Sequence, residues 1–149
     1  MKIVLGFGSN LGDKEANINS AYALLENELG KMVNKSSFME SSPWGFESDN
    51  MFLNSVAVFQ TSKNPFESLE VCKEIEKRVG REGKTEKAFD YKDRLIDIDI
   101  LFYEDYIVNH KDLIIPHPMI TERDFVMIPL KEILPNLIHP VINKAIIDI

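Results

Sequence analysis

Two aspartates one residue apart, Asp97 and Asp99, lie in the segment Leu-Ile-Asp-Ile-Asp-Ile-Leu, where apolar and charged residues alternate as in a β-strand. Alternate side chains of a strand point to the same face, so both carboxylates would project together while the isoleucines face the core. With Cβ atoms ~7 Å apart, the pair could bind Mg²⁺ ions spaced ~4 Å from each other. It could instead be the solvated outer face of an edge strand.

Two arginines and one histidine suggest a polyphosphate ligand for this region. Arg81 and Arg94 flank the segment, and guanidinium groups bind phosphate oxygens in a bidentate manner. His117 stands between Pro116 and Pro118, a restricted corner from which a ring nitrogen could reach a phosphate or simply cap a turn.

A second group of residues could bind a flat heterocycle. Ser42-Pro43-Trp44 and Phe52-Leu-Asn54 combine a rigid turn, aromatic rings and an amide. Such a ligand needs stacking on its faces and hydrogen bonds at its edge. Trp44 and Phe52 could also be ordinary core residues. The glycine-rich segment 6–12 lacks the Lys-Ser/Thr of a phosphate-binding P-loop, which favours a tight strand-to-helix turn.

The elements that would position these residues follow from hydrophobic periodicity and turn signals. Strands are predicted at 2–8, 31–41, 52–61 and 95–103, and helices from Asp13 to Gly30 and from 64 to 80. This order predicts an α+β fold, a ferredoxin-like βαββαβ sandwich with two helices on one sheet face and C-terminal additions, including a short helix near 127–134. The other face would be free to carry the site.

Composition narrows the class of protein. The 149 residues suit a single domain spanning 1–149, and the formal charge of −7 argues against a nucleic-acid partner. No apolar run is long enough for a membrane span, and a secretory signal is not evident, so we expect a cytoplasmic protein. Cys72 is expected to pack in a helix, and His110 and His139 are expected at the surface.

The motifs also occur in an order that resembles a known family. Gly8-Ser-Asn-Leu-Gly12, Pro43-Trp-Gly45, Phe52-Leu-Asn54, Gly80-Arg81, the Asp-Ile-Asp strand, Ile115-Pro-His-Pro118, Glu122-Arg123 and Phe125 are similar to the hydroxymethyldihydropterin pyrophosphokinase family. The resemblance implies a monomeric, Mg²⁺-dependent diphosphotransferase that moves pyrophosphate from ATP to 6-hydroxymethyl-7,8-dihydropterin in folate biosynthesis and releases AMP.

The resemblance also implies roles for individual residues. Two Mg²⁺ ions would bind Asp97 and Asp99, which with Arg81 and Arg94 form the catalytic group. ATP would contact Lys73, Glu76, Arg81, Lys84, Arg94, Ile100, His117, Pro118 and Arg123. The pterin would contact Ser42, Pro43, Trp44, Phe52, Asn54 and Phe125.

The chain departs from the family before the aspartate strand. Many members have Trp-Gly-Pro-Arg where this sequence has Tyr91-Lys-Asp-Arg94, and only Lys84 or Lys87 could replace a second loop arginine. The charged segment 82–93 is expected to be a lid that closes over both substrates. Two other functions remain open: a non-catalytic ferredoxin-like module that binds a small molecule, and a Mg²⁺-dependent phosphohydrolase.

Overall fold

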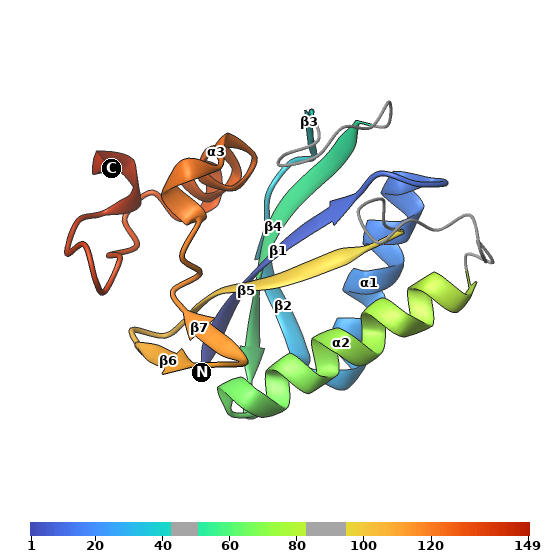
Figure 1. Ribbon diagram of the computed structural model, residues 1–149, viewed down its shortest axis with the longest axis horizontal. Coiled ribbons are helices and arrows are strands. Elements are labelled where there is room, and N and C mark those ends of the chain that lie inside the picture. Colours follow the sequence, from blue (N-terminus) through green and yellow to red (C-terminus); the bar gives the residue numbers. More distant parts are fainter. Residues whose placement is uncertain (43–50, 83–94) are drawn as a thin grey trace.

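The computed structural model describes residues 1–42, 51–82 and 95–149 (Figure 1). Its central antiparallel sheet has the order β2-β4-β1-β5, and β3 pairs with another part of β4. The strands are β1 (Lys2–Ser9), β2 (Gly30–Lys35), β3 (Met39–Ser41), β4 (Phe52–Thr61) and β5 (Asp97–Tyr103). Helices α1 (Lys14–Glu28) and α2 (Pro65–Glu82) cover one face. The ferredoxin-like prediction is confirmed.

The remaining elements follow β5. A hairpin of β6 (Val108–His110) and β7 (Leu113–Ile115) leads to the short 3₁₀ helix η1 (Ile120–Glu122), the helix α3 (Asp124–Ile133) and the 3₁₀ helix η2 (Ile146–Asp148). These are the predicted C-terminal additions, and the helix begins three residues earlier than expected. None of the helices in the described ranges is long and apolar enough to cross a membrane.

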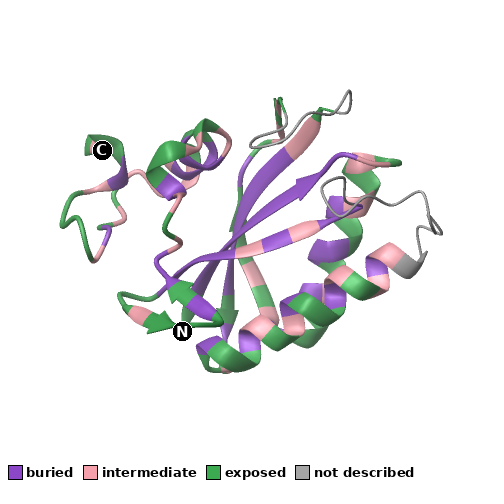
Figure 2. Cartoon of the chain, in the orientation of Figure 1, coloured by how far each residue is buried: buried purple, intermediate pink, exposed green. Residues whose placement is uncertain are grey.

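The main core lies between the sheet and the two helices. Ile3, Leu5 and Phe7 of β1 point to this side, and Ile98 and Ile100 of β5 join them, all of them buried. The helices contribute residues at the predicted three-to-four spacing, including the buried and unpaired Cys72. In Figure 2 the central strands are mostly buried, whereas the helices keep exposed outer faces.

The opposite face of the sheet is only partly open. A second core joins Val4, Val56 and Leu101 of the sheet to Val126 and Leu130 of α3. The register of β1 with β5 shifts between Val4 and Leu5, so that Leu101 is an extra residue on β5. Leu101 follows Asp97 and Asp99 on the open face by regular alternation, and the bulge turns Phe102 to that face as well. The two residues start an apolar surface on which α3 packs.

Two details differ from the sequence-based expectations. The predicted strand 31–41 is two strands, because the Ser36 hydroxyl accepts the backbone N–H of Val56 at 2.9 Å and interrupts regular pairing. His139 is buried rather than at the surface. Its Nδ1 accepts the backbone N–H groups of Val141 and Ile142, both at 3.2 Å, and its ring meets the edge of Phe102.

Candidate active site

The open part of the sheet face places the predicted functional residues in two rows across three strands. Asn54 of β4, Gly8 of β1 and Asp97 of β5 are paired in register, and so are Val56, Gly6 and Asp99. Paired residues on one face lie about 5 Å apart. The two glycines of the central strand leave only backbone between the amide on one side and the carboxylates on the other.

Gly8 is the closest of these glycines to the predicted pterin residues. A Cβ atom added there would lie 3.4 Å from Phe52 Cδ1 and 3.5 Å from Asn54 Oδ1. The glycine-rich segment thus has two parts. Gly6 and Gly8 belong to β1 and form the floor of the site, whereas Gly12, with a φ of 68°, makes the predicted turn into α1. That turn is completed by Asp13, whose side chain accepts the backbone N–H of Ala16 at 3.1 Å and caps the helix.

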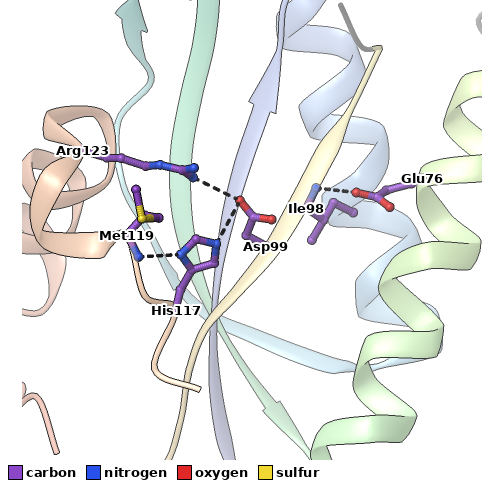
Figure 3. Close-up of polar contacts among 6 residues, drawn as sticks. All are labelled: Glu76, Ile98, Asp99, His117, Met119 and Arg123. Carbon is purple, nitrogen blue, oxygen red and sulfur yellow. Dashed lines mark hydrogen bonds and ion pairs between the residues drawn. The ribbon is translucent and has the colours of Figure 1, made fainter. Parts of the chain in front are cut away.

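The carboxylate pair is arranged as the alternation predicted. Asp97 and Asp99 are partly exposed on the open face, while Ile98 and Ile100 are buried on the helix side. β5 lies at one end of the strand order, which is the edge position that the alternative interpretation assumed. Asp99 Oδ2 lies 3.8 Å from Arg123 Nη1 (Figure 3). Asp99 therefore faces a cation from the segment that leads into α3.

His117 approaches the same carboxylate from the β7–η1 connection. Its Nδ1 accepts the Met119 backbone N–H at 3.1 Å, and its Nε2 lies 4.0 Å from Asp99 Oδ2 (Figure 3). Because Nδ1 is an acceptor, the neutral ring carries its proton on Nε2. Burial lowers the pKa of His117, Arg123 lowers it further, and Asp97 opposes both. The ring therefore caps a turn through Nδ1 and points the Nε2 donor into the site. The sequence had left open whether His117 caps a turn or directs a ring nitrogen toward a ligand, and the geometry allows both.

Glu76 reaches β5 from α2, on the far side of the strand from Arg123 and His117. Its Oε2 accepts the backbone N–H of Ile98, the residue between the two aspartates, at 2.8 Å (Figure 3). Burial raises the pKa of Glu76 to about 8, the Ile98 N–H opposes this shift, and the charges of Asp97 and Asp99 add to it. The family resemblance placed Glu76 near the nucleotide, but this backbone contact could not be read from the sequence.

On the β4 side, the amide of Asn54 has a fixed orientation. Asn54 is buried, and its Nδ2 donates to the Met39 carbonyl at 3.0 Å and to Ser41 Oγ at 2.8 Å. Both amide hydrogens are therefore used, and Oδ1 is the atom that Asn54 can offer to a ligand. Ser41, paired in register with Phe52, was missed in the sequence, where the neighbouring Ser42 was named instead. Ser42 is exposed just after β3.

Phe125 in the first turn of α3 provides an aromatic ring next to the same surface. It is partly buried, it packs against the second core, and the Arg123 guanidinium carbon lies 5.6 Å from its ring centroid. Arg123 thus contacts both Asp99 and Phe125. A cation at this distance from a ring face is attracted to it, which restricts the position of both side chains.

The other predicted residues fall into four groups. Lys73 and Pro118 are exposed, on α2 and after His117, whereas the Ile100 side chain is buried in the helix-side core, so that only its backbone could meet a nucleotide. Arg81 lies in the last turn of α2. Pro43, Trp44, Lys84, Arg94 and positions 83–93 of the predicted lid lie outside the described residues.

The carboxylates fit a magnesium ion that is held together with a substrate. Among residues 1–42, 51–82 and 95–149, no group of three or more His, Cys, Asp or Glu residues could hold a metal ion by itself. Mg²⁺ commonly binds proteins through one or two carboxylates and completes its shell with phosphate oxygens and water. Asp97 and Asp99 match that requirement and do not match a structural metal cage.

Comparisons with known proteins agree on one family. Residues 4–135 match the family model described as 7,8-dihydro-6-hydroxymethylpterin-pyrophosphokinase. A protein of Aquifex aeolicus named 2-amino-4-hydroxy-6-hydroxymethyldihydropteridine pyrophosphokinase is 43% identical over 144 residues, which cover 97% of this chain and 87% of that protein. A protein of the same name from Porphyromonas gingivalis is 40% identical over 139 residues, 93% of each chain.

Longer proteins contain a similar unit. The folic acid synthesis protein FOL1 of Dictyostelium discoideum is 41% identical over 95% of this chain, which spans only 21% of that protein. The crystal structure of Plasmodium falciparum HPPK-DHPS superposes with a TM-score of 0.77 at 20% identity, covering 99% of this chain and 42% of that one. At this identity the superposition supports the fold alone. The family match and the close relatives show that the chain belongs to the 7,8-dihydro-6-hydroxymethylpterin-pyrophosphokinase family.

Proposed function

We propose that the open face of the sheet transfers pyrophosphate from ATP to the hydroxymethyl group of 6-hydroxymethyl-7,8-dihydropterin and releases AMP, a step of folate biosynthesis. One observation supports this most directly. Asp97 and Asp99 share a face with Asn54, and only the backbone of Gly6 and Gly8 separates them. A site for phosphates therefore lies beside a site for a polar heterocycle edge, as a transfer between these two substrates requires.

Asp97 and Asp99 would hold two Mg²⁺ ions against the polyphosphate. Bound Mg²⁺ supplies positive charge that neutralises the phosphate oxygens and orients the acceptor oxygen. On the protein side, the rigid strand β5 fixes both carboxylates on one face, and Arg123 near Asp99 adds a permanent cation. In phosphoryl-type transfer most of the rate comes from positioning and charge stabilisation, which are the contributions these residues make.

His117 would donate a hydrogen bond to a phosphate oxygen through Nε2. The bond from the Met119 N–H to Nδ1 holds the ring so that Nε2 faces the site. Because burial keeps its pKa below the ordinary value, the neutral ring is the form present at neutral pH, and that form still donates. Arg81 and Arg94 would complete the phosphate contacts, as the family resemblance implies.

The pterin would lie between aromatic rings with its edge toward β4. Phe52 and Phe125 would stack against the ring, and the fixed Oδ1 of Asn54 would accept an N–H of the heterocycle. The Ser41 hydroxyl, which already accepts one hydrogen bond from Asn54, retains its own proton as a donor. A donor and an acceptor side by side match the lactam edge of a pterin.

A single incubation tests the assignment. We expect AMP, measured by ion-exchange chromatography, to appear from ATP only when the pterin and Mg²⁺ are both present. Asp99→Asn should reduce this AMP at least about 100-fold, and Asp105→Asn, an exposed residue just beyond β5, serves as the matched control. A phosphohydrolase would release phosphate or pyrophosphate without the pterin, and a binding module would release nothing. Either result would reject the proposal.

Two further properties complete the proposal. We expect the protein to be a monomer, which sedimentation equilibrium tests, and to work in the cytoplasm. Neither property depends on the geometry of the site.

A further inference from the structure

The strand that carries the two aspartates, β5, accepts support at its outer edge from a helix side chain instead of from another strand. β5 lies at one end of the strand order, with β1 as its partner in the sheet. Successive residues of a strand direct their N–H groups to opposite edges. Since the N–H of Ile98 meets Glu76 on α2, the backbone groups of Asp97 and Asp99 face the opposite edge, toward Gly8 and Gly6 of β1.

The contact places a third carboxylate close to two others. Glu76 is partly buried, and its carboxyl group lies beside those of Asp97 and Asp99. Three carboxyl groups in so small a space disfavour the ionised form of Glu76, which raises its pKa. What Glu76 gains in return is the 2.8 Å hydrogen bond from the Ile98 backbone, at the residue that separates the two carboxylates.

We propose that Glu76 is a positioning residue of the transfer reaction, which acts by holding the outer edge of β5 so that Asp97 and Asp99 keep their spacing and direction. The proposal rests on the proposed function of the two aspartates as metal ligands. It differs from the role implied by the family resemblance, in which Glu76 lies near the nucleotide. Glu76 acts instead through the backbone of Ile98, with no need to touch either substrate.

The positioning role and a simple charge effect differ in which replacements of Glu76 they tolerate. If the charge of Glu76 mattered most, its removal would weaken the attraction for Mg²⁺ whether or not the new side chain can accept a hydrogen bond. If the hydrogen bond matters most, its loss frees the edge of β5, weakens Mg²⁺ binding and slows transfer. Partners that orient metal ligands contribute about 10- to 100-fold to metal affinity or activity when they are removed.

Two substitutions separate these effects. Glu76→Gln removes the charge but keeps a carbonyl oxygen that can accept the Ile98 N–H, whereas Glu76→Met keeps the length of the side chain and has no strong acceptor. Glu70→Met, on an exposed position of the same helix, is the matched control for a Glu to Met change. For each variant, kcat/KM and the Mg²⁺ concentration that gives half-maximal rate are measured, after circular dichroism has shown that the fold is intact.

A second measurement needs neither metal nor substrates. Amide exchange of Ile98 is followed by NMR in the protein without ligands, with the amides of Asp97 and Asp99 as internal references, because those face β1. We expect Ile98 exchange to accelerate by about tenfold or more in Glu76→Met and to remain near the wild-type rate in Glu76→Gln. The aspartate amides should change little in both.

The expected kinetic result is a loss of about 10- to 100-fold in kcat/KM for Glu76→Met, with a higher Mg²⁺ requirement, and near-normal values for Glu76→Gln. Equal losses in both variants would show that charge or a direct nucleotide contact matters, and would overturn the proposal. So would normal kinetics in Glu76→Met or an unchanged Ile98 exchange rate. Absence of pterin-dependent AMP in the wild-type protein would instead reject the proposed function, while the exchange data would still report on the hydrogen bond.

Discussion

Adding one methyl group at Gly8 should raise stability and lower pterin affinity. Gly8 lies in the middle of β1, between Asn54 and Asp97 in register. In Gly8→Ala the new Cβ would be 3.4 Å from Phe52 Cδ1 and 3.5 Å from Asn54 Oδ1, which are ordinary contact distances. The protein itself has room for the methyl group, so we expect no clash within the fold. The space that the methyl group takes is the space above the floor of the site.

The two effects can be sized separately. Replacing glycine by alanine inside a strand is worth roughly 0.5–1 kcal/mol of stability, because the unfolded chain loses freedom. Forcing a methyl group against a well-packed ligand costs about 1–3 kcal/mol, as overpacking does in protein cores. A loss of that size corresponds to roughly a 5- to 150-fold weaker binding of the pterin. ATP, which we propose to bind toward the carboxylates, should keep an affinity within about threefold of the wild type.

Titration calorimetry with each ligand and urea denaturation measure these quantities on the same preparation. Gly6→Ala is the companion variant, since its Cβ would meet the side chain of Leu101 at 3.4 Å instead of the pterin residues. A folded Gly8→Ala protein that binds the pterin as tightly as the wild type would show that the ring does not lie over Gly8. Equal weakening for ATP and pterin would show that the methyl group distorts the whole sheet face.

Three further predictions concern charge and anchoring. In the folded protein the pKa of Glu76 is about 8, against 4.5 for the ordinary group, so the folded state holds the extra proton and stability falls as pH rises between those values. In metal-free protein, the free energy of unfolding of Glu76→Gln relative to wild type should therefore increase from pH 4.5 to 8, by at least ~1 kcal/mol in urea denaturation. A stability difference between the two proteins that does not change with pH would contradict this. The pKa of His117 is lowered in the folded protein, so the unfolded chain binds a proton at this residue more readily and stability falls as pH drops below about 6.5. In thermal denaturation, the stability of His117→Gln should fall less steeply with decreasing pH than that of wild type, whereas His110→Gln, at an exposed position, should follow wild type. Glu132 accepts hydrogen bonds from the Ser37 N–H at 3.0 Å and from the Ser37 hydroxyl at 2.9 Å. Glu132→Ala should therefore lower the free energy of unfolding by about 0.5–1.5 kcal/mol, and Glu132→Gln should lower it by less. Equal losses in the two variants would mean that the charge matters more than the hydrogen bonds.

Features governed by local periodicity could be predicted from the sequence. The alternation around Asp97 and Asp99 correctly placed both carboxylates on one face and the isoleucines in the core, because the direction of a strand side chain depends only on its parity. The start of the first helix at Asp13 was correctly predicted, because the bond from Ala16 that caps it spans only three residues. Each of these features depends on residues that are close together in the chain, so a local sequence pattern is enough to predict it.

Features that join distant segments could not be predicted in this way. The bond from Ile98 to Glu76 spans 22 residues and depends on how α2 rests against the sheet. Ser41 orients Asn54 across 13 residues, and nothing in the local pattern distinguishes it from Ser42. His139 was expected at the surface, because the sequence does not show that the C-terminal segment folds back over Phe102. Each of these depends on packing between elements.

Arg123 has a consequence for how the two substrates influence each other. It lies within 4 Å of Asp99, on the proposed phosphate side, and over the ring of Phe125, on the proposed pterin side. A nucleotide that drew the guanidinium group toward its phosphates would then also change the surface on which we propose that the pterin stacks. Such an effect is a coupling free energy, and it is reciprocal: the factor by which ATP alters the dissociation constant of the pterin equals the factor by which the pterin alters that of ATP. A compound that occupies only the pterin half will therefore bind with an affinity that depends on the ATP concentration around it.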